Sequence, residues 1–177
     1  MELPKRKSTR LKNFDYSSKQ LYFVTICTRD RKQLLSEVIK TDLAFIDKTT
    51  GLYVGEGLAP PEYTVKLKPC GKIAKEQLSL IEKRFPTVSI KDYVIMPDHI
   101  HAIIFLHKIA GGASPSPTLD DVICAFKSLT SRICKQQYGI EKIFQRSSAE
   151  HIIRNREDYE TKRNYIYTNP MKWYFKA

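Results

Sequence analysis

The sequence predicts an α+β fold, an RRM-like or ferredoxin-like split βαβ arrangement in which an antiparallel sheet carries helices on one face and an extra C-terminal helix follows. The main observation is the order of the segments: strand, insertion, helix, strand, strand, helix, strand, helix. Two of the strands also follow each other directly at Pro97-Asp98. The length of 177 residues suits a single domain over residues 1–177, because cores form at roughly 100 to 200 residues.

The first strand and the segment after it differ in regularity. Residues 21–28 (LYFVTICT) are apolar, aromatic and β-branched, which predicts a buried central strand. Residues 30–70 lack a clear period and read as a variable insertion. Within it TGLYVGEG and EYTVKLK flank the breaker GLAPP, so we expect an irregular edge hairpin attached to the core.

The middle of the chain predicts helix, two strands and a second helix. Apolar residues recur every three or four positions over Lys72–Phe85, and Pro86 then ends the pattern. VSIKDYVIM and HIHAIIFL read as two strands. We expect residues 110–117 (AGGASPSP) to form a flexible loop. A second helix should run from Thr118, with Asp121 completing a capping box, to about Gln137.

The last part predicts a short strand and a final helix. EHIIR, residues 150–154, is the strand candidate. The helix should begin near Asn155, with Asp158 at the capping-box position. It should end near Asn169, because Pro170 disfavours helical geometry in the residue before it.

The charge of the chain favours a polyanionic partner. Thirty Lys and Arg residues against 19 Asp and Glu give a formal charge of +11, and nucleic acid is the leading candidate. Residues 1–13 form a basic arm for which we expect phosphate contacts, although a solvated tail is the simpler alternative. Its basic residues are Lys5, Arg6, Lys7, Arg10 and Lys12.

Hydrophobic runs, targeting signals and cysteines indicate where the protein works. The longest strictly apolar run, Ala102–Leu106, is far shorter than the roughly 20 residues of a membrane-spanning helix. The first 20 residues show neither a signal peptide nor a lipidation signal, so we expect a cytoplasmic location. Four dispersed cysteines without a CxxC pair argue against a zinc ribbon or a disulfide framework.

The segment MPDHIHAIIFL, residues 96–106, carries the first chemical signal. Side chains alternate along a strand, so His99 and His101 should share one face while Ile100 points to the other. Two imidazoles placed in this way could grip one metal ion. An HxH triplet alone is weak evidence, and two polar residues on a half-exposed strand are the alternative.

The final helix carries the second signal. Residues four apart share a helix face, whereas residues two apart lie about 200° apart, so Tyr165 and Tyr167 should point in nearly opposite directions. Asn169 follows Tyr165 by one turn and offers an amide oxygen to a metal. Two imidazoles and an amide leave positions open for phosphate and water, which suits Mg²⁺ or Mn²⁺ better than structural zinc. The basic residues Arg154, Lys162 and Arg163 lie close by in sequence. We expect them to bind DNA and to favour ionisation of the tyrosine.

These motifs together resemble a known family. PDHIHAIIF, the N-terminal RKSTRLKNFDYSSKQLYFVTICTRDR, and QRSSAEHIIRNREDYETKRNYIYTNP resemble the single-tyrosine HUH transposases, especially the REP-associated tyrosine transposases of bacteria. The resemblance covers nearly the whole chain except roughly residues 35–70.

The resemblance implies a metal-dependent single-strand DNA endonuclease and strand transferase. His99 and His101 match the HUH histidines, Tyr165 the nucleophile and Asn169 the third metal ligand. Attack by the tyrosine would leave a 5′-phosphotyrosine and a free 3′-hydroxyl next to a DNA hairpin. His151 could support the metal ligands or be a structural histidine.

Two other functions remain open at this point. One is a non-catalytic nucleic-acid-binding module that uses basic and aromatic side chains on an RRM-like sheet. The other is a metal-dependent phosphodiesterase that activates water, in which Tyr165 is only structural. The sequence also leaves open whether the protein works as a monomer or a homodimer.

Overall fold

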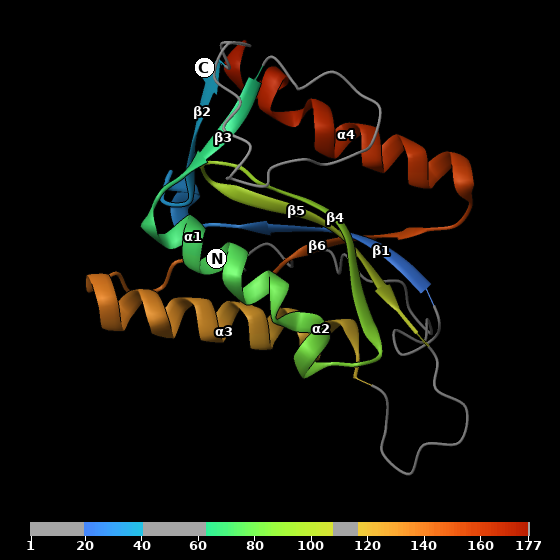
Figure 1. Cartoon of the computed structure of the whole chain (residues 1–177), viewed down its shortest axis with the longest axis horizontal. Helices are drawn as coiled ribbons and strands as arrows, with labels where there is room; N and C mark the ends of the chain where they lie inside the picture. The colour runs from blue at the N-terminus through green and yellow to red at the C-terminus, as the bar shows by residue number, and fades with distance from the viewer. Residues whose placement is uncertain (1–19, 41–62, 108–116, 177) are drawn as a thin grey trace, which may run out of the picture.

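The computed structural model describes residues 20–40, 63–107 and 117–176. The basic arm 1–13, the centre of the 30–70 insertion with TGLYVGEG and GLAPP, and all of the 110–117 loop except Pro117 lie outside the described residues. Within the described ranges the chain forms a four-stranded antiparallel sheet with helices on both of its faces, and a separate two-stranded ribbon (Figure 1).

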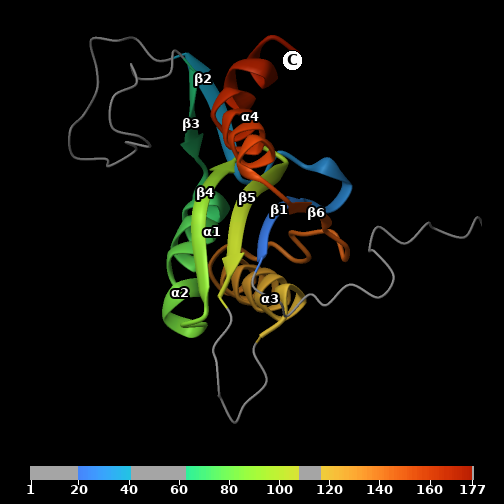
Figure 2. The same cartoon turned by 90° about the vertical axis from the view of Figure 1, so that its right-hand side faces the viewer.

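The main sheet has the strand order β4-β5-β1-β6, which Figure 2 shows edge to edge. Its strands are β1 (Gln20–Cys27), β4 (Val88–Ile95), β5 (His99–Leu106) and β6 (Ala149–Ile153). All of the pairings are antiparallel. The sheet confirms the four strands expected from the sequence and the α+β fold class.

Three helices cover one face of this sheet: α1 (Pro69–Ser79), α2 (Ile81–Arg84) and α3 (Leu119–Tyr138). The sequence predicted one helix over Lys72–Phe85, but the structure starts it at Pro69 and breaks it at Leu80. Proline suits the first turn of a helix because an N–H at that position would have no hydrogen-bond partner within the helix. The Ser79 hydroxyl donates to the Glu76 carbonyl at 2.7 Å and so competes with the helical ladder where the helix ends.

Helix α3 follows the prediction closely. The Thr118 hydroxyl accepts from the Asp121 N–H, and the Asp121 carboxylate accepts from the Thr118 N–H, so the expected capping box is present. Gly139 ends the helix at φ 66°, a left-handed conformation that glycine adopts without steric cost. The apolar stripe of α3 packs into the core under the sheet. Its buried residues include Leu119, Val122, Ile123 and Phe126.

The ribbon consists of β2 (Ser36–Lys40) and β3 (Tyr63–Leu67). The predicted EYTVKLK strand therefore exists, but it pairs with a segment upstream of TGLYVGEG and forms a sheet of its own. Hydrogen bonds attach the ribbon to the end of β4: the Leu35 N–H donates to the Pro97 carbonyl and the Ser36 hydroxyl to the Ile95 carbonyl. These bonds position the ribbon beside the β4–β5 turn.

Helix α4 (Arg156–Tyr174) lies across the opposite face of the sheet from α1 and α3 (Figures 1 and 2). The prediction that it ends near Asn169 is wrong, since Pro170 lies inside it. Pro170 is buried, and the turn after it is held by packing: the Tyr174 ring lies 4.7 Å from the Tyr63 ring, and Trp173 joins the apolar cluster beneath α4. Tertiary contacts thus offset the hydrogen bond that proline cannot make.

Two further expectations concern membrane and redox chemistry. Over the described ranges, no helix combines the length and the apolar composition needed to cross a bilayer. The four cysteines are all free thiols, and Cys70 and Cys134 are buried.

Candidate active site

The two histidines of the HxH motif lie side by side on β5 and face α4. His99 and His101 are both buried, and their ring centroids are 4.5 Å apart. Ile100 lies on the other face of the sheet in the core under α1 and α3. The expected alternation is therefore confirmed, and it places two imidazoles beneath the last helix.

Hydrogen bonds orient both rings in the same way. The Nδ1 atom of His99 bonds to the Asp98 carboxylate, and Nδ1 of His101 bonds to the Thr25 hydroxyl at 2.9 Å. A carboxylate and a hydroxyl can both accept from Nδ1–H, which leaves the lone pair on Nε2 of each ring. Arg31 pairs with Asp98 at 3.5 Å and so extends this support outward.

Burial keeps His101 in the form that a metal needs. Removal from water, assisted by the neighbouring His99 and Arg31, lowers the pKa of His101 from 6.5 to about 3. The ring is therefore neutral near pH 7, and a neutral imidazole is the form that ligates metals.

Residues at four-residue intervals on α4 lie above the HxH pair. The Tyr165 ring lies 5.1 Å from the His101 ring, and the Trp173 ring lies 5.9 Å from the His99 ring. Asn169 stands between them on the same helix face, one turn from each. The four residues predicted for the chemistry, His99, His101, Tyr165 and Asn169, therefore come together in the fold.

The side-chain amide of Asn169 is available to bind another group. Its side chain is buried, and within the described ranges no hydrogen bond engages the amide. The amide is not among the fully buried polar atoms of the described residues that lack a partner, so it is accessible to a bound group. The described residues contain no cluster of three His, Cys, Asp or Glu side chains around a metal-sized space. The two Nε2 atoms and the Asn169 amide oxygen remain the donor set that the sequence predicted for a divalent cation.

Tyr165 differs from the other tyrosines near the site. Its side chain is 40% exposed, and its hydroxyl makes no hydrogen bond within the described part of the chain. The ring packs edge-on against Phe23, with centroids 5.9 Å apart, and the Lys172 ammonium lies 5.2 Å from its centre. Lys172 directly precedes Trp173, and no motif in the sequence marks it as a site residue.

A buried carboxylate anchors α4 beside this site. Asp92 on β4 accepts hydrogen bonds from the Tyr159 hydroxyl at 3.0 Å and the Tyr167 hydroxyl at 3.3 Å, and pairs with Arg163 at 3.4 Å. Burial, reinforced by the bond to Asp92, raises the pKa of Tyr159, and burial also raises the pKa of Tyr167. Both phenols thus stay protonated donors. As predicted, Tyr167 points away from the direction that Tyr165 takes.

The position of Asp92 depends on a β-bulge. The pairing of β4 with β5 shifts between Ile90 and Asp92, so Lys91 is the extra residue. Without the bulge, Asp92 would lie on the same face as Ile90, which packs in the core under α1 and α3. Sequence analysis missed Asp92 because strict alternation places it on the wrong face. Asp98 was also missed as a partner, although it stands directly before His99.

The other predicted site residues have varied positions. Lys162 lies 5.5 Å from the centre of the Phe23 ring, close to the site, whereas Arg163 is engaged with Asp92. His151 is exposed on β6 and bonds to the Asp158 carboxylate at 2.8 Å, so its partner is α4 and not a candidate metal ligand. Arg154 is exposed just before α4. The five basic residues of the arm lie outside the described residues.

Comparison of the sequence with known proteins finds two relatives. An uncharacterized protein of Haemophilus influenzae is 27% identical over 183 residues, which cover 95% of this chain and 89% of that protein. A REP-associated tyrosine transposase of Escherichia coli K12 is 36% identical over 93 residues, 51% of this chain. That match spans 48% of the transposase, about half of its length. No model of a protein family matches the chain.

A solved structure shares the fold. It is described as a REP-associated tyrosine transposase bound to a REP hairpin, and it superposes with a TM-score of 0.56 at 22% identity. The match covers 92% of this chain and 74% of that one. The fold class is thereby confirmed. The sequence match to the Escherichia coli protein bears out the resemblance to REP-associated tyrosine transposases.

Proposed function

We propose that this chain is a transposase that cleaves and rejoins single-stranded DNA beside DNA hairpins, with Tyr165 as the nucleophile. One observation carries the proposal: a half-exposed tyrosine with an unbonded hydroxyl lies 5.1 Å, ring to ring, from a buried HxH pair. The similarity to REP-associated tyrosine transposases supports it.

The residues of the site divide the work of cleavage. The Tyr165 oxygen attacks the phosphorus, the bond from phosphorus to the 3′ oxygen breaks, and that oxygen leaves with a proton as a 3′-hydroxyl. The upstream fragment thus leaves, and the downstream fragment stays on Tyr165 through its 5′-phosphate while the phenol proton passes to solvent. A later attack by a 3′-hydroxyl on this phosphorus breaks the bond to the tyrosine oxygen, which is protonated again, and restores the phosphodiester. The Lys172 ammonium, 5.2 Å from the ring centre, favours the negative charge that Tyr165 develops.

A divalent cation, Mg²⁺ or Mn²⁺, would be held by Nε2 of His99 and His101 and by the Asn169 oxygen, and would polarise the scissile phosphate. Asp98 and Thr25 keep the two rings in the ligating tautomer. Lys162, Arg154 and the basic arm would contact phosphates along the strand and so position it.

The test is a covalent adduct between the protein and a single-stranded oligonucleotide that carries a hairpin. Wild-type protein should form an adduct that survives denaturation, and Tyr165→Phe should lower its yield by at least 10³-fold because the attacking oxygen is gone. Tyr167→Phe is the matched control, since it removes a phenol oxygen from the same helix at a position facing Asp92. An adduct that persists in Tyr165→Phe would refute the assignment.

The same assay separates the rival functions. Excess chelator, His99→Ala and His101→Ala should each abolish the adduct while most of the DNA affinity remains. A nucleic-acid-binding module would bind DNA without any adduct, and a water-using phosphodiesterase would cut DNA without one. Either result would replace the transposase proposal.

A further inference from the structure

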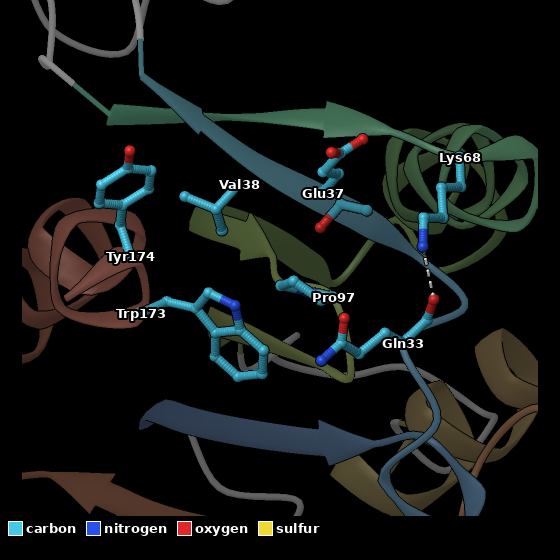
Figure 3. A pocket seen from close by; sticks show the side chains of 8 residues that line it. Gln33, Glu37, Val38, Lys68, Pro97, Trp173 and Tyr174 are labelled. Carbon is cyan, nitrogen blue, oxygen red and sulfur yellow. Dashed lines mark hydrogen bonds between the residues drawn. The ribbon is translucent and has the colours of Figure 1, made fainter. Parts of the chain in front are cut away.

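A cavity of about 440 Å³ adjoins the site on the side of Trp173 (Figure 3). This volume lies within the roughly 300 to 1,000 Å³ of ordinary small-ligand sites. Five parts of the chain meet around it: the segment before β2, β2 itself, the N-terminus of α1, the β4–β5 turn and the end of α4. The side chains that matter here are Gln33, Val38, Lys68, Pro97, Trp173 and Tyr174.

The walls of this cavity combine flat apolar surfaces with polar groups. The Trp173 indole and Pro97 provide apolar surface, and Val38 adds to it from β2. Gln33 contributes an amide, which can donate and accept, and no hydrogen bond within the described residues engages that side chain. Lys68 donates to the Gln33 backbone carbonyl at 2.9 Å, as the dashed line in Figure 3 shows, and brings a cation to the rim.

The cavity also lies next to the HxH pair of the candidate active site. Trp173 forms its wall and packs against His99, with ring centroids 5.9 Å apart. A DNA strand whose phosphate lies between Tyr165 and the HxH pair would therefore pass a neighbouring nucleotide beside Trp173. Unpaired bases stack on aromatic side chains, and amides hydrogen-bond to base edges.

We propose that this cavity receives one unpaired nucleobase of the DNA strand, stacked on Trp173 and hydrogen-bonded by Gln33. The proposal rests on the proposed function, because that function brings single-stranded DNA to the site. It adds a base-binding subsite formed by the β2–β3 ribbon and the last turn of α4. Lys68 would contact the phosphate beside the bound base.

The test uses fluorescence, because the chain contains a single tryptophan. Full-length Tyr165→Phe protein, which lacks the proposed nucleophile, is titrated with (dA)₈ and with an eight-unit abasic oligomer of equal charge. Stacking on Trp173 should make (dA)₈ quench the emission, while the abasic oligomer should not. Equal quenching by both oligomers, or binding of labelled (dA)₈ without quenching, would overturn the proposal.

Variants in the same Tyr165→Phe background check the contacts through the anisotropy of labelled (dA)₈. Trp173→Ala should weaken binding about tenfold or more, and Trp173→Phe should restore most of it. Gln33→Ala, at an exposed position, should weaken binding of (dA)₈ about fivefold and leave the abasic oligomer unaffected. Tyr138→Ala is the control, since Tyr138 is 48% exposed at the end of α3. Unchanged (dA)₈ affinity in both Trp173→Ala and Gln33→Ala would remove the subsite.

These outcomes can be separated from a failure of the proposed function. If wild-type protein forms no DNA adduct but (dA)₈ still quenches Trp173, the cleavage proposal fails and the base site stands. If the adduct forms but the cavity variants bind (dA)₈ like their parent, only the base site fails.

Discussion

The two faces of the four-stranded sheet are built from different kinds of residue. Toward α1 and α3 the strands present an apolar surface, including Val24, Ile100 and Ile104. Toward α4 the same strands present Phe23 and Ile103, but also the buried polar side chains of His99, His101 and Asp92. One face thus supplies most of the core, and the other carries the candidate chemistry.

The difference extends to how the helices are held. Helix α3 buries six residues, five of them apolar or cysteine, against the core. Helix α4 buries only Ile166, Asn169 and Pro170. Polar contacts to Asp92 and ring contacts to the histidines therefore contribute much of the attachment of α4. Stability and catalysis should accordingly respond to different substitutions.

The largest effect on stability is expected from the apolar face. Phe126 is 1% exposed and packs on Phe144, so Phe126→Ala should lower the free energy of unfolding by about 3–5 kcal/mol through lost burial and a cavity. Urea denaturation measures this loss. Phe175→Ala, at a side chain that is 73% exposed, is the control and should stay within about 0.5 kcal/mol.

If the two faces of the sheet act separately, Phe126→Ala should not change the formation of the DNA adduct at Tyr165. At a temperature where the variant is still folded, its rate of adduct formation should stay within about threefold of wild type, because α4 does not rest on that face. A folded Phe126→Ala protein that forms no adduct would contradict the separation of the two faces.

The sequence predicted the apolar face better than the α4 face for a physical reason. Periodic apolar residues report directly on burial, so the four strands of the main sheet and α3, with the capping box at Thr118, were predicted correctly. The HxH pair and the Tyr165–Asn169 spacing are also local patterns, with periods of two and four. Each could therefore be found before any tertiary structure was known.

Features that depend on distant contacts could not be found in this way. The bulge that turns Asp92 toward α4 leaves no mark on the sequence, and neither does the pairing of β2 with β3. The continuation of α4 past Pro170 was mispredicted because local backbone preference favours an end there. Trp173 contacts His99 and Tyr174 contacts Tyr63, and these tertiary contacts stabilise the helix beyond the proline.

An intermediate effect on stability is expected at Asp92. Asp92→Asn removes the charge that pairs with Arg163 and leaves the Tyr159 and Tyr167 hydroxyls with a weaker acceptor. The free energy of unfolding should fall by about 1–3 kcal/mol. The rate of adduct formation should fall tenfold or more, because Tyr165 is carried by the helix that Asp92 holds.

The readout that distinguishes positioning from simple destabilisation is the split between rate and DNA affinity. Asp92→Asn should lower the rate of the covalent step in the folded protein and leave the affinity for the DNA hairpin within about threefold. Asp30→Asn is the matched control, since Asp30 is exposed and, among the described residues, pairs only with Arg29 at 3.6 Å. A normal rate in folded Asp92→Asn would show that α4 is positioned by other contacts.

The smallest effect is expected at the helix N-termini, where the two faces can be compared with matched substitutions. The Thr118 side chain caps α3 by accepting from the Asp121 N–H, and the Asn155 side chain caps α4 by accepting from the Asp158 N–H at 2.8 Å. Removing either cap should cost about 1 kcal/mol of unfolding free energy. By urea denaturation, Thr118→Ala and Asn155→Ala should therefore look alike.

Their effects on chemistry should differ. Asn155→Ala loosens the start of the helix that carries Tyr165, and Asp158 in the same turn also holds His151 of β6. Its rate of adduct formation should fall about two- to fivefold, because fraying spreads into the first turns of a helix with few buried residues. Thr118→Ala frays a helix on the other side of the sheet and should leave the rate unchanged. Equal rates in the two variants would mean that the contacts of α4 with Asp92 are enough to hold the helix. The N-terminus of α4 would then have no part in placing Tyr165.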